Sequence, residues 1–314
     1  MKKILISGLG GSLFPYLHLC LSKKYEMFYV DADKTLCDLY PDYNFFHAPL
    51  INDDIYVTFI QKIIAEHSID IYIPLIDEEI VKAHHIKKKN GNLILISPQF
   101  DFCTLTLNKL ELMKYLEIQG ISKVKSFQGD LFNWEISCPV FVKPIFGRGS
   151  RGIKVITTSE QLKAYFILEN YLPKDILVQD YIEGQEYTVG VLTNNNNDIL
   201  SISSKKVLKK RGITILAANE TNHIIEKVIY DINNKLKPCG PYNVQLFLTN
   251  DEIVKIFEIN PRFSTTTIMS YAGGVDEISM FVEYYNKKYD IPLIRTLNNI
   301  VLHRRWENVF YKKK

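Results

Sequence analysis

One stretch near the end of the chain gathers oxygen-bearing side chains of the kind that bind a hard cation. Residues 245–267 read QLFLTNDEIVKIFEINPRFSTTT, and two apolar runs around a polar turn predict a β-hairpin. Glu258 and Asn260 point the same way on the second strand, and Gln245 lies on the partner strand. A carboxylate and two amide oxygens suit Mg²⁺ shared with substrate phosphates, and Arg262 suits a phosphate or carboxylate.

Alternation along the second strand of this hairpin predicts which side chains share a face. It assigns one face to Val254, Ile256 and Glu258 and the opposite face to Ile253, Lys255, Phe257 and Ile259. A carboxylate beside apolar side chains is costly to bury unless a cation compensates its charge. The alternative is a hairpin with a charged tip, in which Glu258 only pairs with Lys255 or Arg262, and this stretch alone leaves both interpretations open.

A glycine-rich segment supplies positive charge and backbone amide groups. Residues 147–152 read GRGSRG and join predicted strands at 140–143 and 153–156, with Lys143 at the polar end of the first strand. Such amides can wrap an anionic ligand, and the arginines add charge. The segment leads into a strand, unlike a Walker loop, which leads into a helix. We predict a loop that covers phosphates; a flexible hairpin tip is the alternative.

Two further stretches carry polar groups suited to a nucleotide. Residues 177–191, LVQDYIEGQEYTVGV, predict a strand, a bend and a second strand. Exposed backbone groups at the bend can hydrogen-bond an adenine edge, and Glu186 can accept hydrogen bonds from ribose hydroxyls. The strand predicted over 201–210 ends in a basic run that continues to Arg211. Charge near the same cleft and a solvated edge strand guarded by lysines are equally good interpretations of Lys209 and Lys210.

The elements that position these residues begin with an α/β unit. A strand at 2–7, a glycine-rich turn at 8–12, a helix over 13–24 and a strand at 27–30 are typical of a doubly wound α/β domain. The residues argue against dinucleotide binding, because the glycines do not follow GxGxxG and Pro15 stands in the first helical turn. The glycines allow a sharp turn, and a substrate-binding role for that turn stays open.

Apolar periodicity predicts the remaining elements. Helices are expected over 54–67, 110–120, 221–236 and 276–287, and strands over 69–74, 93–96 and 300–303. Three acids, Asp77, Glu78 and Glu79, follow one of these strands. They are best interpreted as the first turn of a helix, where carboxylates are favoured by the helix dipole. A role in holding an amino substrate is the alternative.

Composition limits the class of protein. A chain of 314 residues is long enough for two or three domains, and a net charge of +3 is too small to argue for a nucleic-acid partner. The five cysteines are scattered without a CxxC pair, which indicates neither a zinc site nor a disulfide framework. The N-terminus enters a strand directly, without a signal peptide or membrane span. We therefore expect a cytoplasmic protein with no membrane partner.

The order of these motifs resembles the ATP-grasp superfamily, in particular the branch of the carbamoyl phosphate synthetase large subunit and the pyrrolysine-biosynthesis ligase. Gln245 with FEINPRFS and the following Gly273 and Gly274 carry the resemblance, together with FVKPIFGRGSRG and QDYIEGQEYTVGV. It covers residues 2–288. It implies an α/β fold with an α+β lid: an N-terminal doubly wound parallel-sheet domain over 1–100, an ATP-grasp domain over 101–290 with a lid at about 125–182, and a C-terminal strand and tail over 291–314.

The resemblance also implies roles for single residues. Gln245, Glu258 and Asn260 would hold one or two Mg²⁺, for which Mn²⁺ can substitute, and Arg262 would stabilise an acyl phosphate. The catalytic residues would be Arg262, Lys143 and Asn260. The ATP-binding set would be Lys109, Lys143, Gly147, Arg148, Gly149, Ser150, Arg151, Gly152, Gln179, Asp180, Tyr181, Ile182, Glu186 and Phe257. At the hinge, Gln179 stands where an acid is often found.

The activity implied by the resemblance is that of an ATP- and Mg²⁺-dependent ligase. It would join a small-molecule carboxylate to an amine or a thiol through an acyl phosphate, releasing ADP and phosphate, and a homodimer is compatible with it. The chain is far shorter than carbamoyl phosphate synthetase, so synthesis of carbamoyl phosphate itself is not expected. A nucleotide-binding regulatory protein without catalysis is the main alternative, and an NAD-dependent enzyme is a third.

Overall fold

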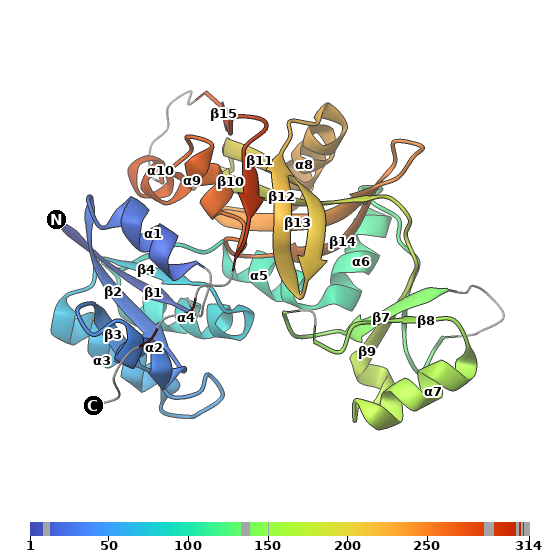
Figure 1. The fold of residues 1–314 in the computed structure, drawn as a ribbon, viewed down its shortest axis with the longest axis horizontal. Helices are drawn as coiled ribbons and strands as arrows, with labels where there is room; N and C mark the ends of the chain where they lie inside the picture. Colours follow the sequence, from blue (N-terminus) through green and yellow to red (C-terminus); the bar gives the residue numbers. More distant parts are fainter. Residues whose placement is uncertain are drawn as a thin grey trace.

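The computed structural model describes residues 1–8, 13–132, 139–149, 151–285, 292–305, 308 and 310 of the chain. In these residues the strands form three sheets, with helices packed around them. Figure 1 shows a sheet built from the N-terminal segment at one end, a large sheet in the middle and a small sheet at the other end, coloured green. We call the small one the lid sheet and the large one the central sheet.

The N-terminal sheet has five strands in the order β3-β2-β1-β4-β5, and every neighbouring pair is parallel. Its strands are β1 (Lys2–Ser7), β2 (Tyr25–Asp31), β3 (Asn44–His47), β4 (Ile71–Pro74) and β5 (Ile94–Leu95). Its helices are α1 (Phe14–Leu21), α2 (Lys34–Leu39), α3 (Tyr56–His67) and α4 (Asp77–Lys89). α1 packs on one face and α3 and α4 on the other, which confirms the predicted doubly wound sheet. The sequence prediction lacked α2 and β3.

The central sheet has seven strands, ordered β14-β13-β10-β11-β12-β16, with β15 paired to β11. Its strands are β10 (Gln185–Thr193), β11 (Ile199–Arg211), β12 (Ile213–Asn219), β13 (Pro241–Leu248), β14 (Val254–Asn260), β15 (Ile294–Arg295) and β16 (Val301–His303). Apolar residues of α5 (Phe100–Leu107), α6 (Lys109–Ile118) and α8 (His223–Leu236) cover one face. The amphipathic pattern of α8 was sufficient to predict it, whereas α5 was not predicted.

Two short helices connect the central sheet to the N-terminal sheet. α9 (Ile268–Ala272) and α10 (Glu277–Tyr284) place Ile268, Ile278 and Phe281 in one apolar core with residues of β1 and α1. α10 ends at Tyr284, before the predicted end at residue 287, which lies outside the described residues. Because the two sheets share this core, the carboxyl ends of the N-terminal strands are held in place relative to β14.

The lid sheet has the order β6-β9-β7-β8 and its own small core. It consists of β6 (Ser126–Gln128), β7 (Val140–Pro144), β8 (Lys154–Ile156) and β9 (Ile176–Asp180), with α7 (Ser159–Leu168) and the 3₁₀ turn η1 (Pro173–Asp175). The glycine-rich segment joins the antiparallel strands β7 and β8, as predicted. The domain boundaries proposed from the sequence stay a prediction.

Among the helices that the structure describes, none is long and apolar enough to cross a membrane.

Candidate active site

A cavity of about 790 Å³ lies between the lid sheet and the central sheet. The lid contributes Lys143 and Gln179 to its wall, and the central sheet contributes Glu186 and Gln245. Sixteen sequence-predicted site residues line it: Lys109, Lys143, Gly147, Arg148, Gly149, Arg151, Gln179, Asp180, Tyr181, Ile182, Glu186, Gln245, Phe257, Glu258, Asn260 and Arg262. Ser150 lies outside the described residues, as do residues 9–12 of the predicted substrate turn.

Gly152 is the predicted residue that does not line this cavity. It lies at the base of the glycine-rich segment, where its carbonyl accepts a hydrogen bond of 2.6 Å from the Tyr165 hydroxyl. Its φ is +65°, and a Cβ there would lie 2.8 Å from the Tyr171 ring. Gly152 therefore shapes the segment, because that backbone conformation and that close approach both favour glycine.

A β-bulge in β14 corrects the predicted faces of the second hairpin strand. Leu246 pairs with Ile256 and Gln245 pairs with Glu258, so Phe257 is the extra residue on β14. Ile256 and Ile259 therefore both enter the apolar core, whereas Phe257 and Glu258 both line the cavity. The predicted common face of Val254, Ile256 and Glu258 is wrong, because uninterrupted alternation does not allow for a bulge, which re-aims a side chain.

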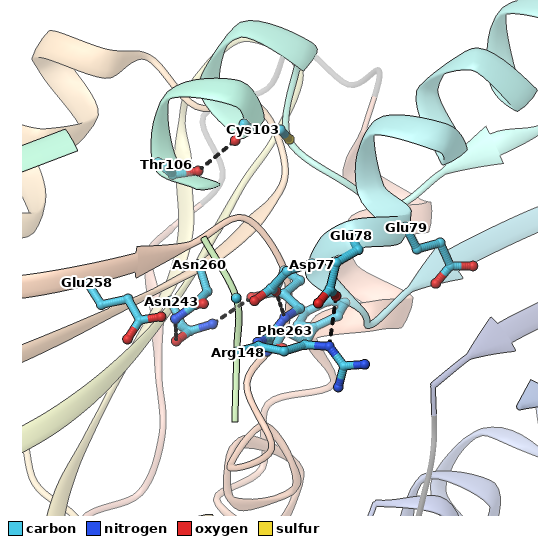
Figure 2. Close-up of polar contacts among 12 residues, drawn as sticks. Asp77, Glu78, Glu79, Cys103, Thr106, Arg148, Asn243, Glu258, Asn260 and Phe263 are labelled. Atoms are coloured by element: carbon cyan, nitrogen blue, oxygen red, sulfur yellow. Dashed lines mark hydrogen bonds and ion pairs between the residues drawn. The ribbon is translucent and has the colours of Figure 1, made fainter. Parts of the chain in front are cut away.

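The candidate metal ligands lie together on β13 and β14. Gln245 is the cross-strand partner of Glu258, and Asn243 is the partner of Asn260. The Asn260 amide donates to Oδ1 of Asn243 at 3.4 Å, and the Asn243 amide donates to the Arg262 carbonyl at 2.9 Å (Figure 2). Sequence reasoning missed Asn243, although it lies two residues before Gln245 on the same strand face.

The donor set contains one carboxylate with several amide oxygens. No group of three or more His, Cys, Asp or Glu side chains suited to a metal occurs in the described part of the chain. Asn and Gln oxygens are also hard ligands that Mg²⁺ accepts. Because Mg²⁺ binds through one or two carboxylates plus phosphates and water, this set fits an ion held jointly with a ligand.

Lys109 and Lys143 bring positive charge to the same end of the cavity. Lys109 begins α6, and its ammonium donates to the Gly147 carbonyl at 2.6 Å and lies 3.8 Å from Glu258. The Lys143 ammonium donates to the Phe257 carbonyl at 2.8 Å. Burial lowers the pKa of Lys143 from 10.5 to about 7; Glu258 opposes the shift, and nearby lysines add to it. An anion in the cavity would restore the charge of Lys143.

Glu258 pairs with neither of the two cations weighed from the sequence. Its ion pair is with Lys109, from an element far away in the chain. The Lys255 ammonium donates instead to the Lys123 carbonyl at 2.9 Å, and Arg262 pairs with Asp77. Glu258 thus lies on the cavity wall among cations rather than at a solvated hairpin tip.

Lys210 resolves the alternatives for the basic end of β11. Its ammonium lies 2.5 Å from a Glu186 carboxylate oxygen and 3.5 Å from the Gln245 amide oxygen, so it lines the cavity. Lys209 is exposed and is absent from the cavity wall. The bulges in the β11–β12 pairing occur at these residues, which simple alternation does not foresee.

Two acids in the first turn of α4 contact arginines of the cavity wall. Asp77 accepts a hydrogen bond from Nε of Arg262, and both side chains are largely buried. Burial alone would lower the pKa of Arg262, but the charge and hydrogen bond of Asp77 raise it. Glu78 binds Arg148, and Glu79 accepts hydrogen bonds from Ser7, Tyr56 and Tyr72. The acids begin a helix as predicted, and two of them also hold arginines of the cavity wall.

The hinge of the lid is the end of β9. Gln179 is buried, and its amide donates to the Ser126 hydroxyl at 2.9 Å, which ties β9 to β6. Beyond it, the backbone at residues 180–184 lines the cavity and leads into β10 with Glu186. These residues and Glu186 line the cavity, and their predicted contacts with adenine and ribose stay predictions.

Two family models match overlapping parts of the chain. The model described as ATP-grasp in the biosynthetic pathway with Ter operon matches residues 173–302, and the D-ala D-ala ligase C-terminus matches residues 109–214. Among curated proteins, the carbamoyl phosphate synthase large chain of Lachnoclostridium phytofermentans is 24% identical over 189 residues. That stretch is 56% of this chain but only 16% of the relative, so the chain spans a small part of that protein.

Solved structures share the fold over most of the chain. Biotin carboxylase from Campylobacter jejuni, in a complex with β-γ-ATP, superposes with a TM-score of 0.74 at 16% identity, over 93% of this chain and 72% of that one. L-amino acid ligase from Bacillus licheniformis superposes with a TM-score of 0.71 at 15% identity, over 91% of this chain and 74% of that one.

The family models and the solved structures show what the chain resembles. The predicted resemblance to the ATP-grasp superfamily is confirmed over residues 173–302, which match the ATP-grasp family model, and the fold is that of the solved structures. The likeness to the carbamoyl phosphate synthase large chain is also found, over about half of the chain. The resemblance to the pyrrolysine-biosynthesis ligase stays a prediction.

Proposed function

We propose that the protein is an ATP- and Mg²⁺-dependent ligase that joins a carboxylate to an amine, or to a thiol, through an acyl phosphate. The observation that carries the proposal is the convergence of Lys109, Lys143, Glu258, Asn260 and Arg262 on one cavity between two sheets. Relatives named as ligases and synthases, among them an L-amino acid ligase, support it. The acyl donor and the acceptor are left open by the cavity wall.

ATP would bind with its phosphates toward the cations and its base toward the hinge. Lys109, Lys143 and the glycine-rich segment surround the phosphate end, and the backbone after Gln179 offers hydrogen bonds to adenine. Glu186 would accept from the ribose hydroxyls, although Lys210 now holds that carboxylate. The ion pair would have to loosen, or Lys210 would turn to the phosphates.

Glu258, Asn260 and Gln245 would hold Mg²⁺, and their oxygens on the cavity wall support this assignment. When bound, Mg²⁺ would neutralise charge on the phosphate oxygens. Asn243 would act behind them, because it binds the Asn260 amide. Its hydrogen bond directs the Asn260 side chain, which leaves the Asn260 oxygen for a cation.

The chain's own groups would stabilise the transferred phosphoryl group. A substrate carboxylate attacks the γ-phosphorus and ADP leaves; the amine then attacks the acyl carbon and phosphate leaves. Lys143 and Arg262 supply fixed positive charge where negative charge accumulates, which is commonly the largest catalytic term. Asp77 keeps Arg262 charged and in place. The glycine-rich segment, closed over the cavity, would keep water from the acyl phosphate.

Release of ADP tests this proposal directly. ATP and Mg²⁺ would be supplied with a panel of amino acids and other carboxylates, singly and in pairs, and ADP would be followed by a coupled assay. We expect release that requires a carboxylate and an amine together, and a Glu258→Gln variant should lower it by about 100-fold or more. Near-normal turnover in Glu258→Gln would contradict the metal assignment. If no member of the panel causes release of ADP but the protein still binds ATP, the result would favour the regulatory nucleotide-binding alternative.

The cellular location and the oligomeric state of the protein do not follow from the cavity. A cytoplasmic location, a homodimer and the absence of a nucleic-acid partner stay predictions of the sequence.

A further inference from the structure

Two adjacent carboxylates at the start of α4 reach arginines from two different parts of the molecule. Asp77 binds Arg262, which follows β14 of the central sheet. Glu78 binds Nε of Arg148, which lies on the glycine-rich segment of the lid, at 2.8 Å. Figure 2 shows Asp77 and Glu78 side by side, with the Arg148 side chain extended toward Glu78. The N-terminal domain therefore touches the lid at the edge of the cavity.

Arg148 lies between two glycines, Gly147 and Gly149, whose backbone conformations favour glycine. Gly147 and Gly149 have φ of +120° and +72°, which L side chains rarely adopt. The Gly147 carbonyl accepts the Lys109 ammonium at 2.6 Å, and Lys109 lies beside Glu258. Lys109 thus connects Gly147 with the candidate metal ligand Glu258, and Arg148 connects the same short segment with α4.

The two arginine contacts differ in exposure, and this difference assigns them different roles. The side chains of Asp77 and Arg262 are 6% and 15% exposed, so breaking their pair would leave a largely buried charge without its partner. The side chains of Glu78 and Arg148 are 43% and 37% exposed, and ion pairs of that exposure are weak. A weak pair forms and breaks easily, which suits a contact made and released in every catalytic cycle.

We propose that Glu78 is the seat on which the glycine-rich segment closes over bound nucleotide, with Arg148 as the group that docks there. Glu78 is then a positioning residue: it touches no reacting atom but holds the segment that would cover the phosphates. The inference rests on the proposed nucleotide site and adds to it a contact from the N-terminal domain. Asp77 makes the seat rigid, because it fixes the first turn of α4 to the central sheet.

A purely electrostatic role for Glu78 predicts the opposite behaviour. A negative charge at the edge of an anion site repels phosphates, so its removal should tighten nucleotide binding and slow release. A seat for Arg148 does the reverse, because its loss lets the segment open sooner. The sign of the change in release rate therefore separates the two roles.

The test is the release rate of a fluorescent N-methylanthraniloyl ATP in Mg²⁺, measured by stopped flow with excess ATP as the chase. We expect Glu78→Gln to speed release by about two- to fivefold, the size of one half-exposed ion pair. Raising the salt concentration should move the wild-type rate toward that of the variant. In an Arg148→Gln background, Glu78→Gln should add no further acceleration, because the partner is already gone.

A matched control is Glu66→Gln, which removes an exposed glutamate paired with Lys62 at 3.6 Å on α3, away from the cavity. It should leave the release rate unchanged. Equal or slower release from Glu78→Gln, or full acceleration in the Arg148→Gln background, would overturn the seat while leaving the nucleotide site intact. A wild-type protein that does not bind the nucleotide would overturn the proposed function itself, and the seat with it.

Discussion

Lys143 is the residue whose chemistry depends most on its surroundings. Its side chain is 2% exposed, and its described hydrogen bond goes to a carbonyl, which cannot neutralise it. Burial lowers the pKa to about 7, so the free protein at neutral pH holds this lysine partly neutral. A phosphate would favour the ammonium form, and nucleotide binding should therefore take up protons near neutral pH. This proton uptake follows from the geometry and not from any single sequence motif.

A pH-dependent stability difference tests the state of Lys143. Between pH 7 and its ordinary pKa of 10.5 the unfolded chain holds the proton and the folded chain does not, so this residue makes unfolding less favourable as pH rises. A Lys143→Met variant lacks this pH-dependent contribution to the free energy of unfolding. Urea unfolding should show it more stable than wild type at pH 7 and below, with the difference shrinking above pH 7 by up to about 1.4 kcal/mol per pH unit. A difference that stays constant with pH would contradict the lowered pKa.

At the scale of elements, the carboxyl end of β14, the part of β13 that pairs with it and the first turn of α4 determine the site. The hairpin, the glycine-rich turn between strands and the helix begun by acids were all predictable, because apolar periodicity and turn residues are local signals. The bulge at Phe257 was not, since the sequence around Glu258 reads as an uninterrupted strand. The partners of Asp77 and Glu78 were not predictable either: Asp77 and Arg262 are 185 residues apart in the chain.

Loss of the Asp77 charge should destabilise the fold as well as the site. An Asp77→Asn variant leaves the largely buried Arg262 without its carboxylate, and breaking a pair of this kind costs about 3 kcal/mol. Urea denaturation of the ligand-free protein would measure the loss. Glu66→Gln, at an exposed pair, should stay within about 0.5 kcal/mol of wild type. An Asp77→Asn protein as stable as that control would mean that Arg262 is solvated rather than held.

At the scale of the whole molecule, the lid sheet and the central sheet surround one cavity, and α4 of the N-terminal domain contacts arginines of its wall. The order of motifs was sufficient to predict the ATP-grasp fold, because each motif marks a strand end that the fold brings to the same place. The sequence did not reveal that the N-terminal sheet shares its core with α9 and α10, or that Asp77 of α4 pairs with Arg262 of the cavity wall. Such contacts depend on packing between distant segments, for which the chain carries no local signal.

The measurement that tests the central claim most directly is calorimetric titration of ATP, in Mg²⁺, into wild type and Lys143→Met. We predict that wild type binds ATP and that the variant, still folded, binds roughly 10- to 100-fold more weakly, since it loses one charge-assisted contact to phosphate. Equal affinity of the two proteins would contradict the assignment of this cavity as the nucleotide site. Absence of ATP binding by wild type would contradict the proposed ligase as a whole.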